Sequence, residues 1–451
     1  MPYPRYLLPA LPLLFACTGG GAADDEPPLT APITTTSTGS TTASSDKGVF
    51  AGLEPRRVLR HTNKVDNVVP MTDGTVAFVG PTPTQLQLGD GSTRPFSSVL
   101  GGELLVVMSS VDQPQLTVQG REVRACRGAR PDELIVATNA LVETDTAGFL
   151  LAPDELLVFR WSAQDGAEVV LRESGAFVQQ LSCSPTGWVA LGTSEVHRTT
   201  GDFINRVRTI APDDEVVLDY ELVMNDARAL IGPDGELVVT GWYTDGTVGP
   251  HRPRHVHPDS LDALAIAIDA GGQEMWQAAI SGGSYDTSWS HQLTEDGRLV
   301  WVAGEAWDGG LIVDGTGTQH QPTDVYERTY VVTLDLQTGA LLANGHTEVA
   351  HTVLDVGGLT VLTVDTVNYP GLLHDLPNEM GSVLFVLDEQ LQPLAADTLV
   401  PEVQLLTASR FYRAVAHEPE GVWVVGPVYL PDDDIDNDLP VVAALVPYHW
   451  L

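Results

Sequence analysis

The stretch DGELVVTG, from Asp234 to Gly241, decides the fold. Its Asp-Gly pair predicts a tight turn, and the β-branched residues that follow favour a strand. Similar stretches recur at intervals of 48 to 63 residues along the 451-residue chain, beginning at Asp73 (DGTVAFVG), Asp132 (DELIVAT), Thr186 (TGWVALGT), Asp234, Asp296 (DGRLVWVAG), Gly357 (GGLTVLTV) and Glu420 (EGVWVVG). Seven copies of one pattern predict a repeat architecture rather than several unrelated domains.

Each copy belongs to a longer unit. A short strand precedes the turn, as in ARALIGPDG ending at Gly235, and a hairpin follows after a variable loop, as in DALAIAIDAGGQEMW from Asp262 and TYVVTLDLQTGALLA from Thr329. Two β-rich runs joined by a Gly- or Asp-containing turn are typical of a hairpin. The sequence therefore predicts an all-β fold, a seven-bladed β-propeller of four-stranded antiparallel blades.

The last unit ends after its third strand, VVAALVPYHWL, which runs to Leu451. A spare strand-like segment, GLEPRRVLRH from Gly52 to His61, precedes the first unit. Pairing these two segments would cover an exposed edge, so we expect the ring to be closed by the N-terminal strand.

The N-terminus carries Arg5 followed by the apolar run LLPALPLLFA, which is typical of a signal peptide over residues 1–16. The residues Leu14, Phe15, Ala16 and Cys17 resemble the lipobox of bacterial lipoproteins, and this resemblance implies an acylated Cys17 as the first mature residue. Ordinary secretion with a coincidental cysteine is the alternative. Residues 17–48 are rich in Thr, Ser, Gly and Pro, which predicts a disordered tether, and residues 49–451 form the propeller domain.

Charge and hydropathy limit the setting. The formal net charge is −37, so the surface repels phosphate backbones and nucleic-acid binding is excluded. The apolar run from Leu7 to Ala16 is too short to span a bilayer, and no other segment is long and apolar enough. We expect a protein of the cell envelope, anchored to the outer membrane through its lipid, with a protein or glycan partner that the sequence does not identify.

The pattern DG.LVV.G from Asp234, followed by A..ID..G...W from Ala265 to Trp276, resembles the SBBP-type propeller repeats of large secreted and surface proteins of bacteria, and more distantly the PQQ-like repeats. The resemblance covers about Gly52 to Leu451. It implies a propeller and an extracytoplasmic setting, but no particular activity.

The connections between second and third strands are long, whereas the other turns are tight, and long loops on a rigid scaffold commonly carry binding residues. Aromatic residues stand where the second strands end, and these binding-face candidates are Trp242, Tyr243, Trp307, Tyr369 and Tyr429. Such rings stack on sugars or peptides, or alternatively they cap the core between blades.

Two loops contain residue types that bind metals. HRPRHVHPD places His251, His255 and His257 within seven residues, but its two arginines disfavour a cation, and a polar surface loop is the alternative. PDDDIDNDLP places Asp432, Asp434, Asp436 and Asp438 at alternate positions, an arrangement that suits calcium or a solvated acidic tip. We therefore expect no cofactor, with calcium at the aspartate loop as the possible exception.

Cys126 and Cys183 fall in the first strands of adjacent units, in a compartment that permits disulfides, and the sequence leaves a disulfide and two buried thiols equally open. There is no GxSxG, HExxH or phosphate-binding glycine loop. We therefore expect a binding or scaffolding surface lipoprotein without catalysis. The alternatives are a propeller enzyme with a pocket at the channel mouth (a quinone-dependent dehydrogenase, lyase or glycosidase) and an outer-membrane assembly scaffold.

Overall fold

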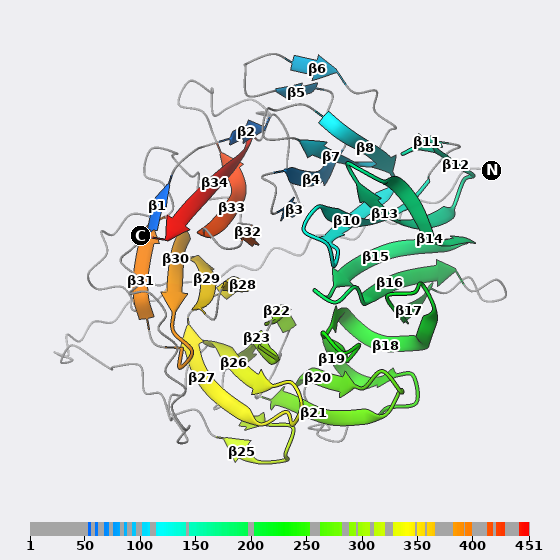
Figure 1. The fold of residues 1–451 in the computed structure, drawn as a ribbon. Helices are drawn as coiled ribbons and strands as arrows, with labels where there is room; N and C mark the ends of the chain where they lie inside the picture. The colour runs from blue at the N-terminus through cyan, green and yellow to red at the C-terminus, as the bar shows by residue number, and fades with distance from the viewer. Residues whose placement is uncertain are drawn as a thin grey trace, which may run out of the picture. The chain divides into compact units, whose positions relative to one another are not determined.

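The computed structural model divides into two compact units, residues 1–32 and 33–451. All described residues lie in the second unit: 53–55, 59–61, 67–71, 75–81, 85–87, 93–95, 102–108, 114–140, 144–196, 203–252, 262–281, 288–294, 296–306, 311–320, 328–347, 350–356, 359–365, 382–391, 393–398, 413–417, 421–428 and 442–450. Within these ranges every regular element is a β-strand, so the all-β prediction is confirmed there (Figure 1). The described part contains no helix that could cross a membrane.

Four sheets are antiparallel runs of four strands, as the repeat pattern predicts. Their strands, in order, are β3 (Asn67–Pro70), β4 (Val76–Pro81), β7 (Glu103–Met108) and β8 (Pro114–Gly120); β9 (Glu122–Arg127), β10 (Glu133–Asn139), β13 (Glu155–Ser162) and β14 (Gly166–Ser174); β22 (Ser288–Leu293), β23 (Arg298–Ala306), β26 (Arg328–Asp335) and β27 (Leu341–Thr347); and β28 (Ala350–Val356), β29 (Leu359–Asp365), β30 (Ser382–Leu387) and β31 (Pro393–Thr398). The second of these is called the β9 sheet below.

A nine-stranded sheet contains two further runs, β15 to β18 and β18 to β21. Its strands are β15 (Ala176–Cys183), β16 (Val189–Val196), β17 (Phe203–Ile210), β18 (Val216–Ile231), β19 (Leu237–Val248), β20 (Asp262–Ile268), β21 (Glu274–Ser281), β24 (Leu311–Val313) and β25 (Gln319–His320). The first part of β18 pairs with β17, with Leu222 opposite Asn205, and its last residues pair with β19, with Ile231 opposite Leu237. One strand thus ends one run of four and begins the next. The run from β15 to residue 223 of β18 is called the β15 unit.

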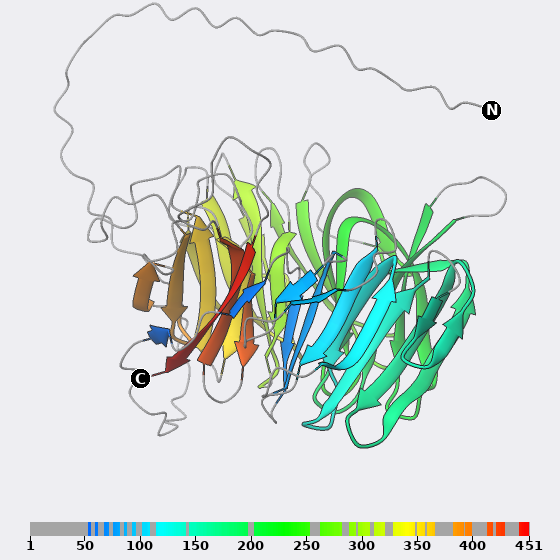
Figure 2. The ribbon, with the colours of Figure 1, turned by 90° about the horizontal axis from the view of Figure 1, so that it is seen from above.

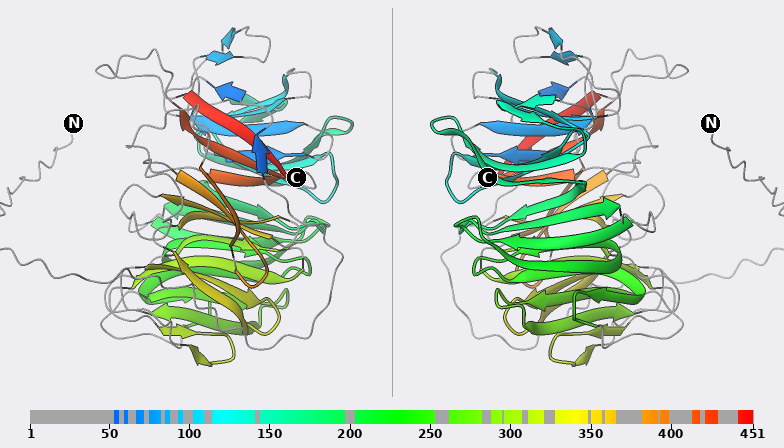
Figure 3. Two further views of the ribbon diagram at one scale, coloured as in Figure 1. Left: turned by 90° about the vertical axis from the view of Figure 1, so that its left-hand side faces the viewer. Right: turned by 90° about the vertical axis from the view of Figure 1, so that its right-hand side faces the viewer.

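The two ends of the described chain meet in one sheet, formed by β1 (Leu53–Pro55), β2 (Leu59–His61), β32 (Arg413–His417), β33 (Gly421–Val428) and β34 (Val442–Trp450). Leu53 lies opposite Trp450 and Leu59 opposite Leu445, both in antiparallel pairing. Figure 3 shows β1 in blue beside the red β34. The expected pairing between residues 52–61 and the C-terminal strand is therefore present.

The turns between first and second strands are set by local sequence. Gly235 and Gly297, each the glycine of an Asp-Gly pair, have φ angles of 86° and 80°, which glycine adopts without strain. The Gly235 amide donates to the Gly232 carbonyl at 3.2 Å and the Gly232 amide to the Glu236 carbonyl at 2.7 Å. These short turns leave little freedom in how the two strands pair.

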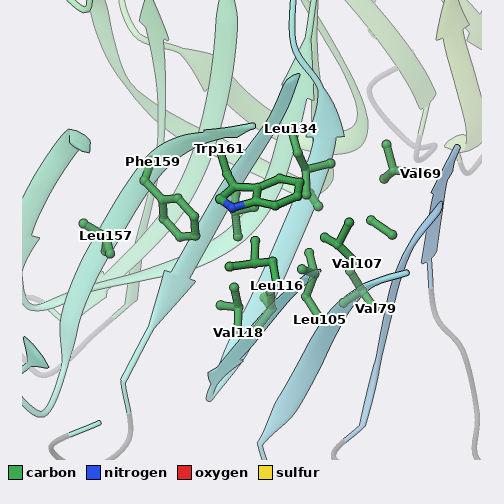
Figure 4. Close-up of a cluster of buried hydrophobic side chains, with 14 of the residues drawn as sticks. Val69, Val79, Leu105, Val107, Leu116, Val118, Leu134, Leu157, Phe159 and Trp161 are labelled. Carbon is green, nitrogen blue, oxygen red and sulfur yellow. The ribbon is translucent and has the colours of Figure 1, made fainter. Parts of the chain in front are cut away.

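Apolar side chains fill the space between successive sheets. Trp161, Phe159 and Leu134 of the β9 sheet meet Leu105 and other residues from β7 and β8 (Figure 4). The other face of the β9 sheet packs through Ile135, Ala137, Leu156 and Val158 against β15 and β16. Both faces are buried because side chains alternate along each strand.

The first strand of each run contacts the first strand of the next. The contacting pairs are β3 with β9, β9 with β15, β15 with β18, β18 with β22, β22 with β28, β28 with β32 and β32 with β3. Figure 2 shows the sheets following one another in chain order from cyan to yellow.

Candidate functional site

The predicted binding aromatics are only partly covered by the described residues. Trp242 lies in β19, half-buried, and Tyr243 follows it in the same strand, with Asp262 of β20 opposite. Trp307, Tyr369 and Tyr429 lie outside the described residues. The structure therefore describes two of the five aromatic residues, and the binding face stays a prediction.

Of the three histidines, only His251 is described; His255 and His257 are not. Its Nδ1 lies 3.6 Å from Oε2 of Glu274, and its ring meets the Tyr220 ring edge-on at 5.8 Å. Over the described ranges, no group of three or more His, Cys, Asp or Glu side chains is placed to hold a metal ion. His251 thus has one carboxylate neighbour and one aromatic neighbour.

Cys17, the proposed site of lipid attachment, and the proposed calcium ligands Asp432, Asp434, Asp436 and Asp438 also lie outside the described residues. Both assignments stay predictions.

The structure joins Cys126 of β9 and Cys183 of β15 by a disulfide, with α-carbons 5.8 Å apart. Cys126 lies opposite Ile135, and Cys183 lies opposite Val189. Ile135 and Val189 belong to one apolar cluster between the two sheets, so both cysteines point into the same space. The disulfide links two neighbouring sheets near their first strands.

The connections between second and third strands carry extra structure. They contain β5 (Gln85–Gln87) with β6 (Thr93–Pro95), β11 (Thr144–Thr146) with β12 (Phe149–Leu151), and β24 with β25. Several of these connections contact the preceding run of strands. Strand β11 contacts β8, and β24 pairs with β21. The last residues of β19 likewise pair with β18, with Val248 opposite Leu222. The insertions therefore form a layer at one end of the strands, opposite the tight turns.

Charged groups gather where β9 begins, at this same end. Oε2 of Glu103 accepts hydrogen bonds from the Val123 amide at 2.6 Å and from the Arg124 guanidinium at 2.7 Å. Nε of Arg124 also donates to the Gln179 carbonyl at 3.0 Å, which ties β7, β9 and β15 together. Beside them, the Arg121 guanidinium lies 4.5 Å from the centre of the Phe177 ring.

Glu122 and Asn139 form a second polar group at this end. They lie directly opposite each other, as the first residue of β9 and the last residue of β10. Oε2 of Glu122 and both amide atoms of Asn139 are buried without a hydrogen-bond partner, and Asn139 is fully buried. A buried polar group without a partner costs about 1–3 kcal/mol of stability. Burial raises the pKa of the Glu122 carboxyl above its ordinary value, although the charges of Arg124 and Arg121 oppose the shift.

Sequence reasoning missed this pair. The only indication of this pair in the sequence is that Asn139 is a polar residue at the end of the strand ELIVATN. Whether such an amide finds a partner depends on the neighbouring sheet, and the sequence does not carry that information.

An arginine in the outer part of the space between the β9 sheet and the β15 unit forms ion pairs with three carboxylates. Arg208 of β17 has a side chain that is 8% exposed and contacts Glu173 of β14. It also lies 2.8 Å from Glu195 and 3.6 Å from Asp219. Burial alone would lower the pKa of Arg208, but the hydrogen bond to Glu173 and the charges of three nearby carboxylates together outweigh it and raise the pKa. The arginine therefore stays charged and holds the β9 sheet to the β15 unit.

His291 occupies the space between β22 and β19. Its Nδ1 lies 2.6 Å from the Thr240 hydroxyl, and Thr240 is fully buried. Burial lowers the pKa of His291 to about 3, and the positive charge of Arg228 adds to this effect. The imidazole is therefore neutral at pH 7 and links two sheets by a neutral hydrogen bond.

No family model matches the sequence, and no curated protein matches it. Among solved structures, the chain is similar to the β-propeller domain of the Trilobed protease from Pyrococcus furiosus, with 10% identity, a TM-score of 0.45, and coverage of 80% of this chain and 88% of that one. It is also similar to the polysaccharide lyase Uly1, with 7% identity, a TM-score of 0.45, and coverage of 87% and 90%. A third is the Pyrococcus horikoshii acylaminoacyl peptidase, with 8% identity, a TM-score of 0.44, and coverage of 84% of this chain and 52% of that chain.

Proposed function

We propose that this chain is an exported lipoprotein, attached to the outer membrane through Cys17, whose seven-bladed β-propeller binds a partner in the cell envelope and has no chemistry of its own. The body stands off the membrane on the tether of residues 17–48. Membership of the propeller body in the SBBP-type repeat family is part of this proposal.

Support for a closed ring of seven blades comes from pairing and contacts within residues 53–450. Seven runs of strands succeed one another, counting β18 in two of them, and the first strands contact in an unbroken cycle from β3 to β32 and back to β3. The C-terminal strand β34 receives β1 and β2 as its outer neighbours. In a propeller, such shared closure joins the two ends of the chain in one blade, and it covers the edge of β34.

The observation that carries the binding role is the difference between the two ends of the strands. At one end, tight turns join the strands, as at Gly235 and Gly297. At the other, three connections carry hairpins that the strand pairing does not require. Rigid strands that present variable insertions are a common arrangement for recognition.

The test is capture of partners by the full tagged chain from detergent-solubilised envelopes. We expect the paired substitutions Trp242→Ala and Trp307→Ala to reduce capture. The matched controls Gln164→Ala and Gln273→Ala, at exposed positions in tight turns, should leave it unchanged. The opposite pattern would place the binding surface at the other end.

The same experiment separates the competing proposals. Co-purification with outer-membrane assembly proteins would favour the scaffold alternative. Visible absorbance of a bound quinone in the purified protein would favour a propeller enzyme instead. Attachment is tested by Cys17→Ser, which we expect to move the protein from the membrane to the soluble fraction.

A further inference from the structure

Three polar side chains lie between the β9 sheet and the β15 unit; Asn139 and Thr193 are buried, and Glu122 is partly buried. Glu122, Asn139 and Leu156 form a row across the β9 sheet. Leu156 packs into the apolar cluster shared with β15 and β16, so Glu122 and Asn139 point to the same side. Thr193 of β16 stands two residues after Leu191, which belongs to that cluster, and therefore points back toward the β9 sheet.

All three side chains carry polar atoms without a hydrogen-bond partner. These atoms are Oε2 of Glu122, Oδ1 and Nδ2 of Asn139, and Oγ1 of Thr193. Asn139 is fully buried and Thr193 is 1% exposed. Apolar side chains of similar size would make the unliganded fold more stable here, because they would bury no unpaired polar group. Polar residues at such a cost to stability are characteristic of binding sites.

The side chains lie close to the ends of their strands. Glu122 is the first residue of β9 and Asn139 the last residue of β10, at the end of the strands that carries the insertions. Glu122 is partly buried, whereas Asn139 and Thr193 are buried. A ligand would therefore reach them from the strand ends, past Glu122.

The residue types limit the ligand. One carboxyl, one amide and one hydroxyl provide donors and acceptors side by side, which suits adjacent hydroxyl groups, since each hydroxyl both donates and accepts. A single carboxyl group is a poor cation site. The nearby guanidinium of Arg124 is already bonded to Glu103 and to the Gln179 carbonyl, so an anion would gain little there.

We propose that Glu122, Asn139 and Thr193 form a binding site for a neutral, hydroxyl-rich ligand, a saccharide, between the β9 sheet and the β15 unit. The site deepens the proposed binding role and rests on it. Because it lies at the end that carries the insertions, a glycan bound there would be held on the same side as the other contacts with the envelope.

The test measures binding of maltotetraose, cellotetraose, chitotetraose and mannotetraose to the full chain by calorimetry, in a detergent without a sugar headgroup. We expect at least one of them to bind. Asn139→Leu and Thr193→Val should each weaken binding at least 10-fold, about 1.4 kcal/mol. Thr333→Val is the matched control, because Thr333 is also a buried threonine whose hydroxyl has no partner, in the distant strand β26. It should leave binding unchanged.

Melting temperatures without ligand show whether the variants fold. We expect Asn139→Leu and Thr193→Val to melt at or above the wild-type temperature, so that weaker binding is not a consequence of unfolding. Absence of binding by the whole panel would overturn the proposal, as would equal loss in Thr333→Val. Calcium binding abolished by the same two variants would overturn the ligand class. A crystal structure with only ordered water on the three side chains, from crystals soaked in the panel, would do so too.

The outcome is separable from that of the proposed function. If partners are captured from envelopes in a manner sensitive to Trp242→Ala and Trp307→Ala while no saccharide binds, only the saccharide site fails. If a saccharide binds through Asn139 but no partner is captured, the partner-binding role fails and the site stands.

Discussion

His291 makes the stability of this fold sensitive to acid. In the folded protein its pKa is lowered to about 3, whereas an unfolded chain has the ordinary histidine value of about 6.5. The unfolded state therefore takes up a proton at a higher pH than the folded state does. The stabilisation is complete above the unfolded pKa and is lost progressively as the pH falls from 6.5 toward 3.

The magnitude follows from the two pKa values. Between pH 7 and pH 5 the linkage amounts to about 2 kcal/mol, from about 1.4 kcal/mol per pH unit over the interval in which only the unfolded state is protonated. It stays near 2 kcal/mol for any folded pKa below about 4.

The assay is denaturant unfolding of the wild type and His291→Gln at pH 7, 6 and 5. At pH 7 the variant should be somewhat less stable because its packing is disturbed. Its loss of stability between pH 7 and pH 5 should be smaller than that of the wild type by about 2 kcal/mol. Comparing the two proteins removes the contribution of the other titrating groups.

Thr240→Val is the control. It removes the 2.6 Å hydrogen bond to Nδ1 but keeps the burial that dominates the pKa shift, so it should retain most of the wild-type pH dependence. Equal pH dependence in the wild type and His291→Gln would refute the reasoning, because it would mean that His291 is protonated in the folded protein at pH 5.

Three other perturbations test the framework of the fold. Replacing Cys126 and Cys183 by serine should lower the free energy of unfolding by about 4 kcal/mol, because the disulfide closes a loop of 57 residues. If mass spectrometry detects two free thiols in the unreduced wild type, the disulfide is absent. Deleting residues 49–61 should lower the melting temperature and promote aggregation, since it uncovers the edge of β34; an unchanged melting temperature would show that the pairing contributes nothing. Gly339→Ala should destabilise the protein by several kcal/mol more than Gly317→Ala in thermal unfolding. The φ angle is positive at both residues, but only at Gly339 would an added Cβ clash, because it would lie 2.6 Å from the Trp276 ring. Similar melting temperatures of the two variants would contradict this packing.

The units of the fold were predictable because their signals are local. A positive φ at Gly235 is encoded by the Asp-Gly pair, and the hairpin from Asp262 to Trp276 lies within a single stretch of chain. The pairing of residues 52–61 with the C-terminal strand was also predictable, since it follows from one missing strand in an otherwise regular series.

Features that depend on other sheets were not predicted. The segment ARALIGPDG predicts a short strand of its own before the turn at Gly235, but the structure has one continuous strand, β18, that serves two runs. The sequence predicts only a long connection between β23 and β26, whereas the structure has the hairpin of β24 and β25 there, and its pairing partner β21 lies in another run. The candidate site of Glu122, Asn139 and Thr193 was missed for the same reason, since an unsatisfied amide is a property of what surrounds it.

Packing of apolar faces explains how the sheets adhere but not how they are fixed relative to one another, because the hydrophobic effect is non-directional. Directional links supply that alignment near the first strands. The Gln180 side chain bonds to the Ala227 carbonyl and the Ala229 amide, and the Ser290 hydroxyl accepts from the Val353 amide at 3.1 Å.

At the space between the β9 sheet and the β15 unit, alignment is already provided by the disulfide and by the ion pairs of Arg208. The polar atoms of Asn139 and Thr193 add no bond to it, since neither side chain has a partner. Alignment explains the polar links of Gln180 and Ser290 but not these two residues. The proposed saccharide site would account for their presence, which is why substitution by Leu and Val is expected to separate stability from binding at this site.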